Sequence, residues 1–386
     1  MQKSIIFDDF ILLVKKLFSN KSKIPLHEPL FTGLEKKYVD ECIKSTFVSS
    51  IGNYVSEFES SIKKYTGSKY AIATVNGTSA LHIALKVSGV SAGTEVLTQS
   101  LSFVATCNAI SYCGAKPVFI DINKLNLSMC PQALENFFLK NTEIDKYGRC
   151  INKVTKNIIS ACLPMHTYGL VANIEEINQL CQLNHVTLIE DAAESLGSFN
   201  NGKHTGNIGK MSAISFNGNK ILTTGGGGMI LTNDSHLAEQ ARHLTTTAKL
   251  KNDFYIEHSE IGYNYRMPNI NAALGLGQVK NLGQFVEAKR LLAKKYQSWG
   301  NENNIEFLTE VEGTKSNYWL NTIILEDSKE RDYFLDLLNR NNISVRPTWT
   351  PMHMQEIYKR CYYDNLENTE WSFQRAVNVP SSVVNE

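Results

Sequence analysis

Short apolar runs alternate with longer segments of helical periodicity between about residues 60 and 235. Continuous apolar runs, typical of strands that are covered on both faces of a parallel sheet, occur at residues 70–75, 95–98, 117–120, 158–163, 186–189, 211–216 and 227–232. Apolar residues at helical spacing follow two of these runs, at 80–87 and 103–112. Strands that alternate with helices predict an α/β domain with right-handed crossovers.

The pattern changes after about Lys280, where the chain becomes helical and charged and then includes a strand-like run at 318–323. A single hydrophobic core rarely grows beyond roughly 250–300 residues, and this chain has 386. We therefore expect an N-terminal helix and arm over residues 1–30, a large domain over 31–284, and a smaller C-terminal α+β domain over 285–386.

The N-terminal segment contains an apolar stretch, FILLV at 10–14, that could suggest a signal peptide. Asp8 and Asp9 precede it, Lys15 and Lys16 follow it, and no small-residue cleavage site appears. The segment is therefore interpreted as an amphipathic helix that packs on the body of the protein or on a partner. No other segment approaches the ~18–20 apolar residues of a membrane span, so we expect no membrane insertion.

Composition narrows the function classes further. The 39 Lys and Arg residues balance 38 Asp and Glu, a formal charge of +1, so no charge surplus indicates nucleic acid or an anionic membrane as partner. The eight cysteines are scattered, without a Cys-x-x-Cys pair or a His–Cys cluster at zinc spacing. They predict reduced thiols in a cytoplasmic protein and no metal site.

Of two glycine-containing segments, one could bind an anion. The NGTSA sequence at 76–80 falls at a strand-to-helix turn, where free backbone N–H groups attract anions and Thr78 and Ser79 add hydroxyl donors. The alternative is an ordinary helix N-cap. The four glycines at 225–228 have neither the spacing of a nucleotide P-loop nor that of a dinucleotide fingerprint, so they predict a tight turn with close backbone approach.

Charged side chains mark a second candidate site. Asp191 and Glu194 follow the apolar run at 186–189, at the end of a strand where open α/β sheets bind ligands. They could face the same side of a short helical turn, or they could be first-turn acids that stabilise a helix. Lys220 lies in a partly apolar connection, which can favour a neutral amine suited to bonding with a carbonyl. The alternative is a solvated surface lysine.

Taken in order, seven motifs resemble the DegT/DnrJ/StrS sugar aminotransferases, which are pyridoxal-phosphate (PLP) enzymes of fold-type I. They are NGTSAL at 76–81, SFVAT at 102–106, HTYG at 166–169, EDAA at 190–193, SFNGNK at 215–220, TGGGG at 224–228 and GYNYRM at 262–267. The likeness covers roughly residues 24 to 382. It implies a large three-layer domain with a mainly parallel sheet and a smaller C-terminal α+β domain.

A narrower likeness points to the LegC-type branch of that family. It rests on IPLHEP at 24–29, FVSSIG at 47–52, ES at 194–195, RPTW at 346–349 and NVPSS at 378–382. The branch resemblance implies amination of a UDP-linked 4-keto-6-deoxy-N-acetylhexosamine at C4, with L-glutamate as donor. It also implies a place in bacillosamine or legionaminic acid synthesis, or in lipopolysaccharide or capsule synthesis.

The same resemblance assigns roles to individual residues. Lys220 would hold PLP covalently and then move the proton during transamination, and Asp191 would keep the pyridine nitrogen protonated. Glu194 would lie near the hydroxyl of the ring, where many relatives carry Gln or His. The remaining expectations are stacking on the ring for Phe103, phosphate binding for Gly77, Thr78, Ser79 and Ser215, a phosphate contact from the neighbouring subunit of a homodimer for Asn264, and substrate contacts for His166 and Arg266.

Three other functions remain as alternatives at this stage. Related deoxysugar dehydratases carry a histidine in place of the lysine, whereas Lys220 is present here. A non-catalytic binding protein on the same fold would leave Lys220 and Asp191 without a chemical role. A nicotinamide-linked dehydrogenase would need the glycine fingerprint that is absent after the first strand. The stereochemistry of the sugar product is left open by the sequence.

Overall fold

The computed structural model describes residues 2–19, 21–250 and 254–384. Its α-helices are α1 (Gln2–Leu17), α2 (Leu34–Ser45), α3 (Asn53–Thr66), α4 (Gly77–Val87), α5 (Val104–Tyr112), α6 (Pro131–Asn141), α7 (Ile174–Leu183), α8 (Ser235–Thr245), α9 (Asn269–Val279), α10 (Leu282–Asn303), α11 (Ser328–Arg340) and α12 (Glu367–Phe373). Its strands are β1 (Tyr70–Thr74), β2 (Thr94–Gln99), β3 (Lys116–Ile120), β4 (Thr142–Ile144), β5 (Cys150–Asn152), β6 (Ile158–Leu163), β7 (Thr187–Asp191), β8 (Phe199–Asn200), β9 (Lys203–His204), β10 (Met211–Ser215), β11 (Gly228–Thr232), β12 (Glu306–Phe307), β13 (Thr314–Lys315), β14 (Asn321–Ile324), β15 (Arg346–Pro347) and β16 (Ala376–Val379). Single 3-10 turns lie at Thr167–Gly169 and Met352–Met354.

The central sheet has nine strands, with the main order β1-β11-β10-β7-β6-β2-β3. Along this order only β11 runs against its neighbours, since it pairs antiparallel with both β1 and β10, whereas the remaining pairs are parallel. The mainly parallel sheet expected from the sequence is thus confirmed. The predicted strand ends agree with the observed ones to within two residues, because each apolar run is buried on both faces of the sheet.

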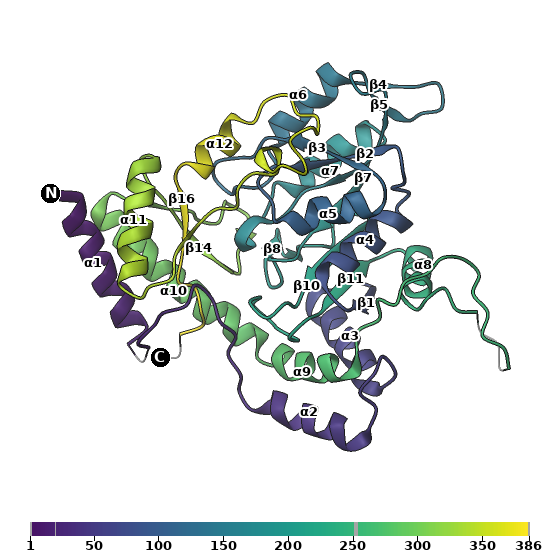
Figure 1. The fold of residues 1–386 in the computed structure, drawn as a ribbon, viewed down its shortest axis with the longest axis horizontal. Coiled ribbons are helices and arrows are strands. Elements are labelled where there is room, and N and C mark those ends of the chain that lie inside the picture. The colour runs from purple at the N-terminus through teal and green to yellow at the C-terminus, as the bar shows by residue number, and fades with distance from the viewer. Residues whose placement is uncertain (1, 20, 251–253, 385–386) are drawn as a thin grey trace.

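Helices cover both faces of this sheet and make three layers (Figure 1). Side chains alternate between the faces along each strand. In β1, Ile72 packs into the apolar cluster beneath α4, α5 and α8, while Ala71 and Ala73 pack with Phe58 of α3 in the cluster on the other face. Helices α6 and α7 cover the β2, β3 and β6 region of that second face. The parallel strands therefore end, with their carboxyl termini, along one edge of a fully covered sheet.

A second, four-stranded sheet lies in the C-terminal part, in the order β12-β14-β16-β15. The strand expected at 318–323 begins only at Asn321, because Tyr318 adopts a left-handed backbone conformation (φ 46°) that interrupts the extended run. Helix α1 packs beside this sheet and α10 (Figure 1). The ring of Phe10 lies 4.7 Å from that of Trp299. The N-terminal amphipathic helix therefore packs on the body of the protein.

The C-terminal segment returns to the central sheet before it completes the second one. The backbone N–H of Met352 donates to the Ser100 carbonyl (2.8 Å), and that of Phe119 donates to the Tyr362 carbonyl (2.9 Å). The boundaries expected near residues 30 and 284 thus remain predictions, because residues from beyond 284 build part of the surface over the central sheet. Within the described residues, no helix is both long and apolar enough to cross a membrane.

Candidate active site

A cavity of about 360 Å³ opens at the carboxyl ends of the parallel strands, the edge at which open α/β sheets bind ligands. Of the residues singled out in the sequence, it is lined by Gly77, Thr78, Phe103, Asp191, Glu194, Ser215 and Lys220. These residues end β7 and β10 or lie in the segments that follow β1, β2, β7 and β10. Segments separated by more than 140 positions in the sequence thus meet in one place, as the parallel topology requires.

The first turn of α4 forms one end of this cavity. The side chain of Asn76 caps the helix by accepting from the backbone N–H of Ser79 (2.7 Å), and Ser79 itself is buried and does not line the cavity. Gly77 faces Ser215 so closely that a Cβ at Gly77 would lie 2.9 Å from the Ser215 Cβ. Because the first backbone N–H groups of a helix have no intrahelical acceptor, this end of the cavity suits an anion.

The glycine run at 225–228 explains how α4 reaches this position. A Cβ at Gly228 would collide with the Asn76 carbonyl oxygen, and Gly225 has a left-handed backbone (φ 77°). The tight turn with close backbone approach predicted for this run is therefore confirmed. Its function is to bring the start of β11 against the turn that precedes α4.

Asp191 ends β7 with a carboxylate that is only 2% exposed. Its Oδ2 accepts from the Thr106 hydroxyl (2.7 Å) and its Oδ1 from the Ala193 backbone N–H (3.1 Å). Burial raises the pKa of Asp191, although these two donors and the charge of Lys220 oppose the rise. Among the described residues no cationic side chain forms an ion pair with Asp191, so a cationic ligand group beside it would stabilise its charge.

Lys220 and Glu194 form a buried ion pair in the same cavity. The Lys220 Nζ lies 2.9 Å from Glu194 Oε1, with the two side chains 12% and 1% exposed. The backbone N–H of Tyr168 donates to Glu194 Oε2 (2.9 Å). Burial raises the pKa of Glu194 to about 7, although Lys220 and the Tyr168 amide oppose the shift. Glu194 is thus held between a cation and a fixed amide and titrates near neutral pH.

The pKa of Glu194 leads to a prediction for the cofactor-free protein. A carboxyl whose pKa is raised in the folded state destabilises the fold as pH rises from about 4.5 to 7, because only the unfolded chain is then fully ionised. The variant Glu194→Gln removes this dependence. Its free energy of unfolding, relative to wild type, should therefore increase by up to roughly 3 kcal/mol over that interval.

Denaturant unfolding at several pH values measures this difference. Glu287→Gln is the matched control, because Glu287 forms an exposed pair with Lys315 at 2.8 Å and the hydrogen bond from Lys315 lowers the Glu287 pKa. The control should show no rise between pH 5 and 7. A Glu194→Gln curve parallel to wild type across that interval would show that Glu194 is already ionised at pH 5.

Two tryptophans of the C-terminal part, Trp319 and Trp349, complete the cavity lining. Neither was predicted from the sequence to be a site residue. The Nζ of Lys220 lies 3.8 Å from the centre of the Trp319 ring, a cation–π contact that orients the lysine. Trp349 packs at 4.7 Å from the buried ring of Tyr168. The signal that could have identified Trp349 was its place in the RPTW motif at 346–349; Trp319 lies in no motif that was recognised.

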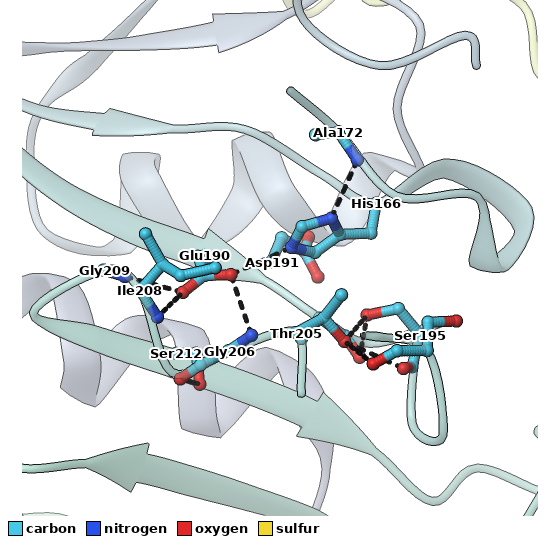
Figure 2. Close-up of polar contacts among 12 residues, drawn as sticks. His166, Ala172, Glu190, Asp191, Ser195, Thr205, Gly206, Ile208, Gly209 and Ser212 are labelled. Atoms are coloured by element: carbon cyan, nitrogen blue, oxygen red, sulfur yellow. Dashed lines mark hydrogen bonds and ion pairs between the residues drawn. The ribbon is translucent and has the colours of Figure 1, made fainter. Parts of the chain in front are cut away.

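His166 does not line the cavity, and Figure 2 shows the network that holds it instead. Its Nε2 lies 3.0 Å from Glu190 Oε2, and its Nδ1 accepts from the Ala172 backbone N–H (3.1 Å). The carboxylate of Glu190 also accepts from the backbone N–H groups of Gly206, Ile208 and Gly209. Both ring nitrogens thus have partners, and the fully buried side chain supports the strand next to Asp191. The substrate contact expected for His166 remains a prediction.

Arg266 and Asn264 also lie outside the cavity lining. Arg266 donates to Glu59 Oε1 (2.6 Å), which also accepts from the Ala73 backbone N–H (2.8 Å), so the arginine fastens α3 to β1. Asn264 is exposed and forms an isolated antiparallel bridge with Thr246, at the start of the loop that projects beyond α8 (Figure 1). Within one chain, Arg266 thus bonds to Glu59 and Asn264 is exposed. The substrate contact expected for Arg266 and the contact with a second subunit expected for Asn264 remain predictions.

Comparison with known proteins agrees with this geometry. Residues 31–384 match the model of the DegT/DnrJ/EryC1/StrS aminotransferase family. The putative pyridoxal phosphate-dependent aminotransferase EpsN of Bacillus subtilis is 37% identical over 366 residues, which cover 93% of this chain and 91% of EpsN. The GDP-perosamine synthase of Escherichia coli O157:H7 is 36% identical over 364 residues, 93% of each chain.

Solved structures give the same assignment. PseC of Helicobacter pylori, an aminotransferase involved in the biosynthesis of pseudoaminic acid, superposes with a TM-score of 0.83 at 25% identity and covers 93% of both chains. A DegT DnrJ EryC1 StrS aminotransferase from Brucella abortus has a TM-score of 0.82 at 26% identity and covers 90% of both chains. This chain therefore belongs to the DegT/DnrJ/EryC1/StrS aminotransferase family and uses pyridoxal phosphate as its cofactor.

Proposed function

We propose that this aminotransferase moves the amino group of L-glutamate to C4 of a nucleotide-linked 4-keto-6-deoxyhexose. The observation that carries the proposal is the convergence of Lys220, Asp191 and the start of α4 on one cavity. The amino donor, glutamate, and the acceptor, the keto sugar, would occupy this cavity in turn, because an aminotransferase must release the keto acid before the keto sugar is aminated. The same site would therefore act on a small dicarboxylate and on a larger sugar nucleotide.

The residues present fit the cofactor. PLP carries a phosphate, a ring nitrogen that becomes cationic and a carbonyl carbon, and the cavity offers one partner for each. The N-terminus of α4, with Thr78 and Ser215, would bind the phosphate. The buried carboxylate of Asp191 would bind the cationic ring nitrogen. The Lys220 amine would bond to the carbonyl carbon. When bound, PLP supplies a ring that withdraws electrons from the carbon next to the amine.

The protein's own groups would then position and move protons. Lys220 would carry the proton between the carbon that loses it and the carbon that gains it. Glu194 accepts from Lys220 at 2.9 Å and, in this proposal, keeps the amine in the cavity once it is free of the cofactor. Phe103, which is 50% exposed, would cover one face of the ring. Ser79 would contribute to the phosphate site indirectly: its backbone N–H donates to the Asn76 side chain, and this bond caps the start of α4.

The proposed acceptor is a UDP-linked 4-keto-6-deoxy-N-acetylhexosamine, as the LegC-type motifs suggest. A GDP-linked 4-keto-6-deoxyhexose is the second candidate, because several relatives at 34–36% identity are GDP-perosamine synthases. Either product would serve amino-sugar, nonulosonic acid or surface-glycan synthesis. We place the reaction in the cytoplasm, a location supported by eight cysteines that are all free thiols.

The proposed assembly is a homodimer with shared active sites. Asn264 is exposed and bridges to Thr246 across the base of the segment between α8 and α9, in which Ile256 and Ile261 are 73% and 83% exposed. Exposed apolar side chains of this size are typical of contact surfaces. If Asn264 completes the phosphate site of the other subunit, mixing inactive Lys220→Ala with inactive Asn264→Ala subunits should restore activity. Monomeric, fully active protein in sedimentation would contradict the shared site.

Product analysis tests the substrate directly. The PLP-loaded protein is incubated with L-glutamate and either the UDP-linked or the GDP-linked keto sugar, and the nucleotide products are identified by mass spectrometry. The proposal expects an amino sugar from the UDP-linked acceptor, at a higher kcat/KM than from the GDP-linked one. Preference for the GDP-linked acceptor would select the second candidate. Absence of both amino sugars would refute the acceptor class.

A further inference from the structure

Trp349 is a large aromatic residue of the cavity lining to which the cofactor assignment gives no role. The polar groups at the α4 terminus, Asp191 and Lys220 are each matched to a group of PLP, and Phe103 to its ring face. Trp319 is only 4% exposed and carries the Lys220 ammonium over its ring. Trp349, in contrast, is only partly buried and packs against the apolar core on one side, so indole surface remains available toward the cavity.

The chain holds this indole firmly in place. The ring of Tyr168 lies behind it at 4.7 Å and that of Phe103 beside it at 6.2 Å. The backbone is anchored on both sides of Trp349. The Thr348 N–H donates to the Ala376 carbonyl (3.2 Å), and the Met352 N–H donates to the Ser100 carbonyl (2.8 Å). An aromatic face fixed in this way can bind a ligand without a large cost in side-chain entropy.

We propose that Trp349 is a specificity-determining residue whose indole packs against the sugar ring of the acceptor. The inference rests on the proposed function, in which the cavity binds first the amino donor, glutamate, and then the acceptor, a keto sugar nucleotide. A pyranose presents C–H groups on its faces, and a 6-deoxy sugar adds a methyl group, so an indole can bury apolar surface of the acceptor. Glutamate has a short chain that ends in a carboxylate and offers no comparable face. Trp349 therefore contributes to the second half-reaction and not to the first.

The two half-reactions can be measured separately. The glutamate half-reaction is followed by the absorbance change of the bound cofactor, and the acceptor half-reaction by the KM and kcat for UDP-4-keto-6-deoxy-N-acetylglucosamine. Trp349→Ala should leave the rate with glutamate within about twofold of wild type and raise the acceptor KM about tenfold, a size typical of losing one aromatic contact. Trp349→Phe should raise the acceptor KM by about threefold, since a smaller aromatic face remains.

Trp371→Ala is the matched control. Trp371 is also a partly buried tryptophan packed against the same apolar cluster, but Lys124 lies over its ring at 4.7 Å and it lines a different cavity. Its loss should lower thermal stability without changing the acceptor KM. An unchanged KM in Trp349→Ala, or an equal loss in both half-reactions, would overturn the inference. If wild type itself did not respond to glutamate, the proposed function would fail first, and the two failures are thus distinguishable.

Discussion

Replacing Lys220 by alanine should reduce transamination by at least about 10⁴-fold, because in the proposed mechanism the variant loses both the amine that would bind the cofactor covalently and the base that would move the proton. The structure gives no substitute, since Lys220 is the only lysine among the residues that line the described cavity. Turnover of glutamate and the keto sugar nucleotide, measured at saturating PLP, checks the prediction. The protein should still fold, because the Lys220 side chain packs mainly against Trp319 and Glu194.

The matched control for this variant is Lys315→Ala, which removes another lysine paired with a glutamate at a similar distance, 2.8 Å, but on the surface. Its activity should stay within twofold of wild type. Addition of a small primary amine to Lys220→Ala should restore part of the proton transfer. Turnover above about 1% of wild type in the unassisted variant would mean that another group performs the chemistry.

Asp191→Asn should lower kcat by about 10²–10³-fold, the usual loss when one charged group arranged for the transition state is removed. An amide has nearly the shape of the carboxylate: its oxygen can still accept from the Ala193 N–H, which contacts Asp191 at 3.1 Å, and its NH2 group can donate to the Thr106 hydroxyl oxygen, which lies at 2.7 Å. It cannot stabilise a positive ring nitrogen. The loss should therefore appear in kcat for both half-reactions, while the amount of PLP bound per subunit changes little.

Thr106→Val separates charge from positioning at the same carboxylate. It removes one neutral donor to Asp191 and keeps the charge, so its kcat should fall by no more than about tenfold. Stopped-flow measurement of the glutamate half-reaction gives both values. If Asp191→Asn retained kcat within threefold of wild type, the electronic role of Asp191 would be refuted, whatever the effect on stability.

The sequence predicted the sheet well because parallel strands covered on both faces are continuous apolar runs. The run at 158–163 corresponds to β6 without any shift. The second sheet was harder to predict: its strands are short, and a left-handed residue, Tyr318, breaks the apolar run at 318–323. The return of the C-terminal segment to the central sheet depends on long-range contacts such as the one between Met352 and Ser100, which leave no local pattern.

For the site, motifs predicted the residues that end strands or begin helices. Lys220, Asp191 and Gly77 were identified in this way and line one cavity. Residues that act through packing were missed. Trp319 reaches the site from the C-terminal part, where its indole N–H donates to the Asn219 carbonyl (2.8 Å). His166, named from the HTYG motif, lies outside the cavity lining and contacts Glu190 at 3.0 Å, so its contact with the substrate remains a prediction.

Both half-reactions can be followed in one experiment by the absorbance of the PLP-loaded wild type, recorded before and after L-glutamate and again after the UDP-linked keto sugar. We expect that glutamate removes the band of lysine-bound PLP, that the keto sugar restores it, and that one amino sugar forms per cycle. A band that glutamate leaves unchanged would contradict the aminotransferase assignment of this site. A band that glutamate removes but no keto sugar nucleotide restores would contradict the proposed acceptor.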